Sequence, residues 1–301
     1  MATATSTKPP LKAIRHPAHP LALWHLLSLD APTIAALWTW FIASANHIHL
    51  PLSSTLAMAL AVWMLYAADR LMDARLIDAR LMDARLADID PTHHEDLEAR
   101  HYFHHRHRTA FLTGILLASI ALALLLPHLE PAAIRLYLVL GVLISGYFVL
   151  IHATHSAHRL PKEIAVGLFF AAATFIPTVA RRPDLRLPLL PSALLFATLC
   201  SLNCLFIYAW EHTSTNHRAH PITRLAVRNL PSLTVLLTLS STALALLDHN
   251  APWPMPCAAA LAAAILLLLH NLRLSIAPIT LRAAADLALT TPILLVFVLH
   301  R

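Results

Sequence analysis

The chain is poor in charged residues and in glycine. Of its 301 residues only 13% are charged, whereas 58% are hydrophobic; a soluble domain carries about 25% charged and about 45–50% apolar residues. This leaves too little polar surface to cover a globule in water, which excludes disorder and favours a polytopic membrane protein. Its four glycines are not clustered, so a glycine-rich phosphate-binding loop is excluded as well.

Cysteine is also scarce, and the basic residues are dispersed. Cys200, Cys204 and Cys257 all lie in apolar runs, where small buried or lipid-facing residues are the simplest interpretation and no disulfide scaffold is indicated. The formal net charge is +6. Dispersed Lys and Arg in an apolar chain indicate membrane topology, and we expect no nucleic-acid partner.

Nine apolar stretches are each long enough, at roughly 20 residues, to cross a bilayer as a helix. Helices are required because lipid offers no hydrogen bonds to the backbone. The expected spans are 21–45, 51–68, 109–127, 132–152, 163–180, 188–210, 230–248, 254–271 and 282–300. The sequence thus predicts an all-α membrane protein with a tail at 1–20, one transmembrane domain at 21–301 and a polar insertion at 69–108.

The positive charges predict the orientation. With the N-terminus inside, the inside segments hold 17 of the 22 Lys and Arg residues and the outside segments hold 5. Cytoplasmic loops carry such an excess of Lys and Arg. We therefore expect an integral protein of the bacterial inner membrane, with a cytoplasmic N-terminus and with its chemistry at the cytoplasmic ends of the spans.

Two acids at the end of the second expected span share one helix face. Asp69 and Asp73 are four residues apart, so their carboxylates lie side by side and repel unless a positive group joins them. Mg²⁺ suits such a pair because it takes one or two carboxylates together with substrate phosphates. The alternative is a solvated pair of acids neutralised by Arg70 and Arg75.

A five-residue pattern follows, in which Leu-x-Asp-Ala-Arg recurs from residue 71 to Asp88. Five residues turn a helix by about 140°, so its acids do not line one face. Pairs such as Arg75 and Asp78 are three residues apart and can stabilise a protruding helix. A tandem duplication that lengthens this helix is the simplest interpretation.

The segment Asp69-Arg70-Leu-Met-Asp73 resembles the first acidic motif of the UbiA superfamily of intramembrane prenyltransferases. Leu65 and Tyr66 stand where that motif begins with Asn and Asp. The entry to the fifth span, from Lys162 to Gly167, resembles the basic entry to the family's fifth helix. The family's second acidic motif follows span six, and here that stretch, from Asn203 to Arg228, holds Glu211 as its single acid.

The resemblance implies a nine-helix bundle with a cytoplasm-facing cavity and a Mg²⁺-assisted activity. A prenyl diphosphate and a hydrophobic, often aromatic, acceptor would meet in this cavity within the bilayer. The implied metal ligands are Asp69 and Asp73. The implied catalytic residues are Lys162, Asn203 and Glu211. The cations implied for the diphosphate, beside Lys162, are Arg159, Arg224 and Arg228.

Other functions stay open at this point. A non-catalytic scaffold or lipid-binding protein with the same fold accords with the incomplete second motif. The run His101-Tyr-Phe-His104-His105 is a literal HxxHH box, as in membrane di-iron desaturases and hydroxylases, and histidine is a common ligand of iron. Those enzymes need three such boxes, and this chain has one. No repeated pair of broken helices indicates a transporter.

Two further acids fall inside expected spans, where an ionisable residue is a functional candidate. Asp30 lies in the first span and could face the cavity or pair with an arginine. Asp286 lies in the last span, four residues after Arg282. A functional role for Asp286 and an ion pair with Arg282 are both open on the sequence.

Overall fold

The computed structural model describes residues 20–86, 103–104, 106–153, 161–211, 220–248 and 252–299. Within these ranges every regular element is helical, including two short 3-10 turns, Leu126–His128 and Pro183–Leu185, so the expected all-α class is confirmed. The α-helices are α1 (Pro20–Leu26), α2 (Asp30–Ala45), α3 (Leu52–Leu86), α5 (Arg108–Leu125), α6 (Pro131–Ala153), α7 (Lys162–Arg181), α8 (Leu190–Glu211), α9 (Pro221–Arg228), α10 (Leu230–Leu247), α11 (Pro254–Leu272), α12 (Pro278–Ala288) and α13 (Pro292–Leu299).

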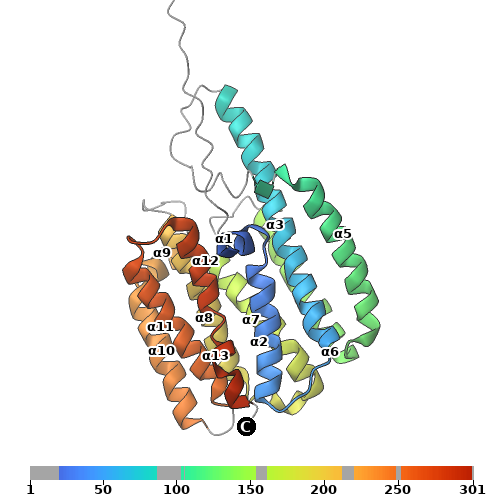
Figure 1. Cartoon of the computed structure of the whole chain (residues 1–301), viewed down its shortest axis with the longest axis vertical. Helices are drawn as coiled ribbons and strands as arrows, with labels where there is room; N and C mark the ends of the chain where they lie inside the picture. Colours follow the sequence, from blue (N-terminus) through green and yellow to red (C-terminus); the bar gives the residue numbers. More distant parts are fainter. Residues whose placement is uncertain are drawn as a thin grey trace, which may run out of the picture.

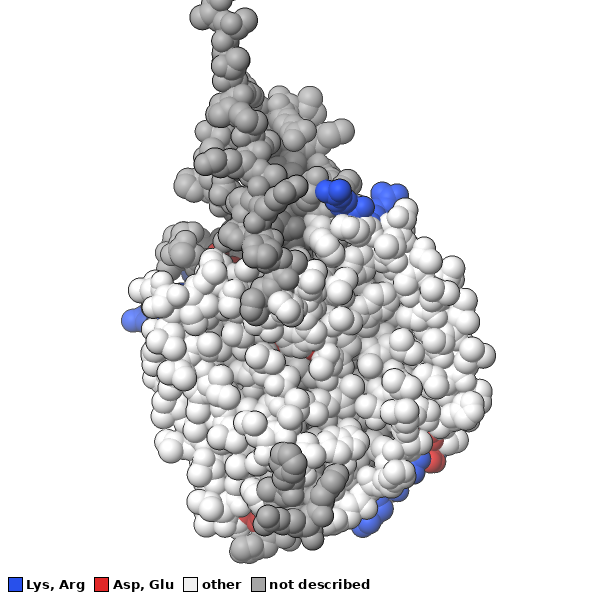
Figure 2. Space-filling view, viewed as in Figure 1, with Lys and Arg blue, Asp and Glu red and all other residues white. Residues whose placement is uncertain are grey.

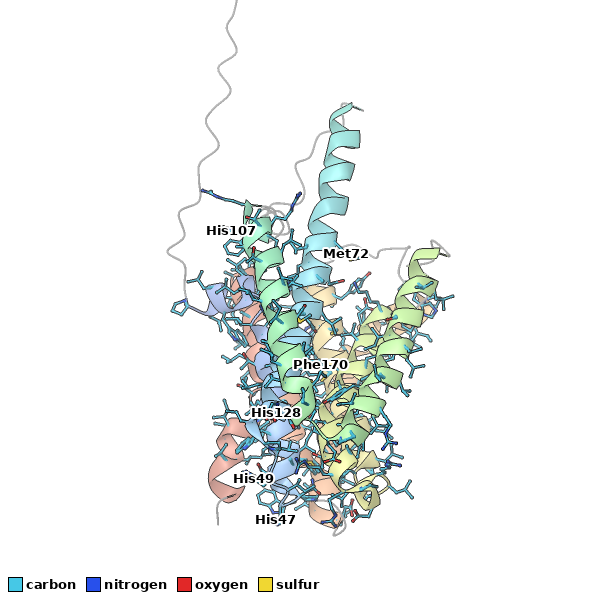
Figure 3. The ribbon with its side chains drawn as sticks, turned by 90° about the vertical axis from the view of Figure 1, so that its right-hand side faces the viewer. His47, His49, Met72, His107, His128 and Phe170 are labelled. Carbon is cyan, nitrogen blue, oxygen red and sulfur yellow. The ribbon has the colours of Figure 1, made fainter. Side chains whose placement is uncertain are left out.

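The helices run up and down one bundle (Figure 1). α1, α9 and the start of α12 lie at one end, which we call the α9 end, and the turns after α2, α5 and α7 lie at the opposite end. Figure 3 places Met72 and His107 toward the α9 end, and His47 and His49 at the opposite end. Residues that follow the second span therefore share an end with those that precede the third.

Seven helical segments of the described chain are long and apolar enough to cross a membrane. They are Leu52–Met72, Arg108–His128, Lys162–Arg181, Leu190–Glu211, Leu230–Leu247, Pro254–Leu272 and Pro278–Val296. The other two expected spans are shorter, because α2 has 16 residues and the described apolar part of α6 is Pro131–Tyr147. A membrane protein is therefore supported, and the count of nine spans stays a prediction.

The first expected span, 21–45, is not one continuous helix, and that expectation was wrong. α1 ends at Leu26 and α2 begins at Asp30, with Ser28 between them at a φ of 58°. A non-glycine residue rarely adopts positive φ, so the backbone turns sharply here. An acid in the first position of α2 and Pro32 in its first turn both favour a new helix start.

The last expected span, 282–300, is interrupted in the same way between Ala288 and Pro292. Hydrogen bonds from buried side chains join the break to α2 and α11. Trp38 Nε1 donates a hydrogen bond to the carbonyl of Leu289 over 2.8 Å, and Thr291 Oγ1 donates to the carbonyl of Ala258 over 2.8 Å. The carbonyl of Leu289 needs such a partner because an unpaired backbone group costs several kcal/mol in lipid.

α3 extends beyond the bundle at the α9 end, where it rises above its neighbours (Figure 1). It has 35 residues, which is about 52 Å of helix, whereas the bilayer core is about 30 Å thick. Its backbone is helical through Leu86, so most of the five-residue repeat prolongs this helix as expected. The side chains of residues 73–86 lie outside the described residues.

The core lies where α2, α7, α8 and α11 pack together. Trp38 of α2 stacks on Phe196 of α8 with ring centroids 4.0 Å apart, and both side chains are fully buried. Small residues on α11, including Ala258 and Ala262, allow its close approach to this core.

The outer surface of the bundle is apolar. Large side chains such as Leu138, Val142 and Leu239 are more than half exposed. In Figure 2 the charged atoms gather mainly at the two ends, with a white belt between them. A soluble protein rarely exposes a continuous apolar surface of this extent, so the belt is the surface that lipid would cover.

α7 and α8 approach closely at Gly167, where a side chain has no room. A Cβ built on Gly167 would lie 2.2 Å from Oγ of Ser201, 2.5 Å from its backbone nitrogen and 2.7 Å from the carbonyl oxygen of Ala197. The backbone of α8 therefore requires glycine here.

Replacing Gly167 by alanine is expected to push α7 away from α8. The free energy of unfolding should fall by about 1–3 kcal/mol, as it does when other cores are overpacked. The matched control is Gly141→Ala on α6, where nothing lies within 4 Å of the added Cβ. The measurement is thermal unfolding of both purified variants in detergent. Equal midpoints for the two variants would contradict the close contact.

Candidate functional site

Charged and polar side chains from five helices meet inside the bundle toward the α9 end. We call this group the central cluster. Its members are His25 of α1, Asp30 of α2, Arg70 of α3, Asn203 of α8 and Asp286 of α12. Ionisable residues in a membrane domain are costly and are commonly functional, so this cluster is a candidate site.

Asp30 is the most strongly held residue of the cluster and is only 2% exposed. Its Oδ2 lies 2.6 Å from His25 Nδ1 and 3.2 Å from a guanidinium nitrogen of Arg70, and its Oδ1 accepts the backbone N–H of Ala31 over 2.9 Å. Arg70 also donates to the carbonyl of His25 over 2.6 Å. One arginine thus ties α3 to both sides of the break between α1 and α2.

Asp286 approaches the same ring nitrogen of His25 as Asp30 does. Asn203 Nδ2 donates to its Oδ1 over 2.9 Å, and its Oδ2 is 3.7 Å from His25 Nδ1. The open alternative of an ion pair between Asp286 and Arg282 is not found, because Arg282 pairs with Glu211 instead. The two acids of the first and last spans are therefore brought together, although 256 residues separate them.

The break between α1 and α2 shapes this cluster. It places Asp30 at the first position of α2, where the helix dipole favours a negative charge. Trp63 Nε1 donates to the carbonyl of Leu27 over 3.1 Å, which holds the connecting residues against α3. His104 Nε2 lies 3.4 Å from Oγ of Ser28 on the same connection.

Asp69, the first expected metal ligand, is half-buried on α3 and forms no hydrogen bond or ion pair with another described residue. Met58, Val62 and Tyr66 form the row of α3 that packs on α2. Asp69 lies three residues after Tyr66 and so continues that row toward the α9 end. The side chain of Asp73, the second expected ligand, lies outside the described residues.

The expected cations gather where α9 meets the start of α7. Thr223 Oγ1 donates to a carboxylate oxygen of Glu163 over 3.0 Å. Lys162 precedes Glu163 and Arg224 follows Thr223, so this hydrogen bond brings two exposed cations to one place. Arg228 is also exposed, one turn after Arg224 on the same face of α9. Arg159, the remaining expected cation, lies outside the described residues.

Glu211, the single acid of the second motif, ends α8 in a half-exposed ion pair with Arg282 of α12. Directly before Glu211, Trp210 Nε1 donates a hydrogen bond to His270 Nδ1 of α11 over 3.1 Å. Asn203 lies two turns below Glu211 on α8 and is buried in the central cluster. The expected catalytic residues Asn203 and Glu211 thus occupy one helix and are held by neighbouring positions of α12.

Of the HxxHH box, only His104 lies within the described residues. Its ring is fully buried and stacks on Phe111 with centroids 4.5 Å apart. In the described part of the chain, one group of His, Cys, Asp or Glu side chains could hold a metal ion. It consists of His25, Asp30 and Asp286, whose ligand atoms all lie within 4.8 Å of one another.

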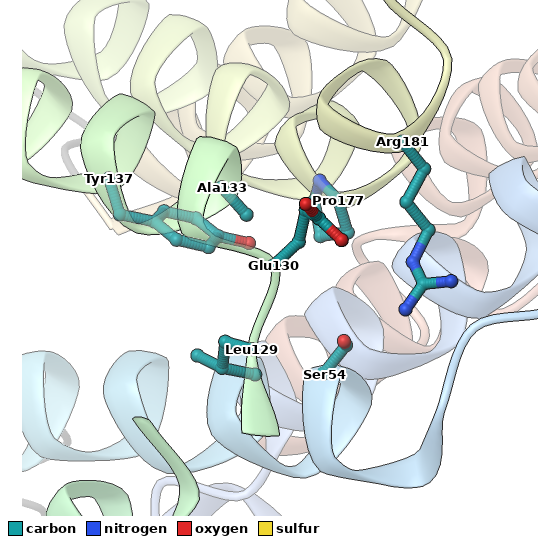
Figure 4. Close-up of a pocket in the computed structure, with 7 residues that line it drawn as sticks. All are labelled: Ser54, Leu129, Glu130, Ala133, Tyr137, Pro177 and Arg181. Atoms are coloured by element: carbon teal, nitrogen blue, oxygen red, sulfur yellow. The ribbon is translucent and has the colours of Figure 1, made fainter. Parts of the chain in front are cut away.

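A small pocket opens at the opposite end of the bundle (Figure 4). Its lining residues are Ser54, Leu129, Glu130, Ala133, Tyr137, Pro177 and Arg181, none of which was expected at a site. On the loop nearby, Arg182 and Asp184 form an exposed ion pair of 2.7 Å, and the hydrogen bond from Arg182 lowers the pKa of Asp184. The cavity expected at the cytoplasmic ends of the spans stays a prediction.

Comparisons with protein-family models, with curated proteins and with solved structures found no match to this chain.

Sequence reasoning noted Asp30 and Asp286 but missed how they are joined. His25 lies in an apolar run and was not singled out, and Arg70 was considered only as an alternative partner of Asp69 and Asp73. The signal that could have found the cluster is the helix start at Asp30, with Pro32 two residues later. A break there turns His25 back toward Asp30.

Replacing Arg70 by methionine is expected to lower the free energy of unfolding by about 3–5 kcal/mol, because Asp30 then lacks its permanent counter-charge inside the bundle. Arg224→Met, on the exposed face of α9, is the control and should leave stability unchanged. Unfolding midpoints in detergent measure both. Adding Asp30→Asn to Arg70→Met should restore part of the loss, and strict additivity of the two substitutions would argue against the pair.

Proposed function

We propose that this protein is an intramembrane prenyltransferase of the UbiA type, which transfers the prenyl group of a prenyl diphosphate to a hydrophobic acceptor. The observation that carries the proposal is that two groups expected separately from the sequence lie at the same end of the bundle. These groups are the carboxylate of Asp69 on α3 and the cations of α7 and α9, namely Lys162, Arg224 and Arg228.

The chemistry needs both groups. Transfer breaks the bond between the allylic carbon and the diphosphate oxygen, and the diphosphate leaves with the electron pair. The acceptor carbon then forms the new bond and loses a proton to water. Lys162 and Arg224 would neutralise the charge that grows on the diphosphate, and this would lower the barrier to its departure. The apolar bundle interior would hold the prenyl tail and exclude water.

A magnesium ion fits the residues at this end. Mg²⁺ prefers oxygen ligands and combines one or two carboxylates with substrate phosphates. Asp69 offers a half-buried carboxylate without a hydrogen bond or ion pair to another described residue, and Asp73 is the expected second ligand. When bound, the ion would supply electrostatic stabilisation of the diphosphate.

The central cluster gives the proposed prenyltransferase site a second line of support. Arg70 follows Asp69 directly and is anchored between His25 and Asp30. This anchor fixes the rotation of α3, and therefore the direction in which Asp69 projects. Asn203 belongs to the same network, so positions from the first and second motifs are joined through three residues.

We also propose that the α9 end faces the cytoplasm of a bacterial cell, with the protein in the inner membrane. Most of the described Lys and Arg residues lie at this end. Those of the opposite end are Arg135, Arg181, Arg182 and Arg186, and Arg182 is paired with Asp184. Among the described residues, this excess of Lys and Arg at the α9 end is the pattern of cytoplasmic loops.

A second candidate is a non-catalytic lipid-binding protein with the same fold. One observation favours it: Glu211, the single acid of the second motif, is neutralised by Arg282. A carboxylate engaged in an ion pair is a weaker ligand for a second metal ion. The two candidates differ in whether diphosphate is released.

The decisive experiment uses the full chain in lipid vesicles with radiolabelled geranylgeranyl diphosphate, Mg²⁺ and a membrane extract as the source of acceptors. We expect labelled lipid product and released diphosphate. Asp69→Asn with Asp73→Asn should reduce both by more than about 100-fold, in the range that removal of one key electrostatic group produces.

The matched control is Asp184→Asn, an acid of the opposite end whose loss should leave the rate unchanged. If the double variant turned over as fast as the wild type, the proposed site would be wrong. If the wild type bound the diphosphate without releasing product, the lipid-binding candidate would replace the enzyme.

A further inference from the structure

The central cluster contains more hydrogen-bond acceptors and negative charge than its own donors satisfy. We propose that it binds one divalent transition-metal ion, separately from the magnesium ion proposed on α3. The ligands are His25, Asp30, Asp286 and Asn203.

The distances suit a common ion. His25 Nδ1 lies 2.6 Å from Asp30 Oδ2 and 3.7 Å from Asp286 Oδ2, and these ligand atoms all lie within 4.8 Å of one another. Nitrogen and oxygen ligands at about 2.1 Å from a shared ion are about 3–3.5 Å apart. The observed separations bracket that range, so small side-chain shifts bring all three atoms onto one centre.

Asn203 provides independent evidence for a ligand. The residue is 6% exposed, and its Nδ2 bonds to Asp286, which places the amide against the cluster. Its Oδ1 is buried and has no hydrogen-bond partner among the described residues. A buried acceptor left unpaired costs about 1–3 kcal/mol, and coordination by a cation would remove this cost.

The charges of the cluster also favour a bound cation. Two carboxylates, Asp30 and Asp286, face one permanent positive charge on Arg70. One carboxylate is therefore left without a permanent counter-charge in a membrane interior, where an uncompensated charge is expensive. A metal ion would supply this charge and would also pair with Oδ1 of Asn203.

The donor set selects the class of metal. One imidazole nitrogen with carboxylate and amide oxygens suits Mn²⁺, Fe²⁺ or Zn²⁺ better than Mg²⁺ or Ca²⁺, which take oxygen alone. Arg70 touches Asp30 and the backbone of His25, and so orients two of the ligands from outside, as outer partners do in metal sites. The ion would join α1, α2, α8 and α12.

The test measures Mn²⁺ binding to the purified full chain in detergent, after removal of metals with EDTA. Free Mn²⁺ is counted by electron paramagnetic resonance during titration. We expect one site in the wild type, and Asp286→Asn should weaken it by more than about 100-fold, since loss of an outer partner alone costs 10–100-fold. Asp184→Asn is the matched control and should bind as the wild type does.

Two further variants keep the outcome decisive. Asp69→Asn with Asp73→Asn should retain the site, which separates it from the proposed magnesium site. Asn203→Asp adds a carboxylate in place of the unpaired amide, and should tighten Mn²⁺ binding by at least about tenfold and increase the rise in melting temperature that Mn²⁺ produces. This variant answers the question even where Asp286→Asn fails to fold.

The inference is overturned if the wild type binds no Mn²⁺, which would assign the missing charge to a proton on His25. It is also overturned if the site disappears in the α3 double variant while Asp286→Asn keeps it. In that second case the ion would bind at Asp69 and Asp73, which would support the proposed function. The metal site in the central cluster and the proposed function can therefore fail independently.

Discussion

The structure depends on how one carboxylate is neutralised inside an apolar bundle. Asp30 is held by Arg70 and His25, all three nearly fully buried. Removing a carboxylate from water costs several kcal/mol, so this position is tolerable only with a partner of opposite charge in good geometry. The pairing fixes the rotation of α3 about its axis, and with it the position of Asp69. Hydrophobic packing alone would leave α3 free to take several rotations at little cost.

The sequence was sufficient for the fold class and for most helix positions, because apolar runs of about 20 residues have few alternatives. It failed at the breaks near Ser28 and between Ala288 and Pro292. A hydropathy pattern does not reveal where a helix is interrupted, because the residues on both sides of the interruption are mainly apolar. Local signals were present in Asp30 and Pro32, but they compete with the apolar pattern, and only tertiary partners such as Trp38 decide the outcome.

The candidate site was predictable in part for a different reason. Residues at the ends of spans can be assigned to one side of the bundle by counting crossings, which predicts that Lys162 and Arg224 lie at the same end. The hydrogen bond between Thr223 and Glu163 joins the two helices that carry them. Pairings between spans distant in sequence could not be derived. Arg282 had two acids within reach, Asp286 one turn away and Glu211 on another helix, and it takes the distant one. Spacing along a helix does not reveal what a neighbouring helix offers.

The distribution of the central cluster along the chain bears on how the protein is built during synthesis. Asp30 and Arg70 lie 40 residues apart on consecutive helices, so their charges can neutralise each other as soon as α2 and α3 form a hairpin. Asp286 is synthesised after α8, which already carries its partner Asn203. Asp30 thus needs only the next helix for its counter-charge, and Asp286 meets a polar partner that was synthesised before it.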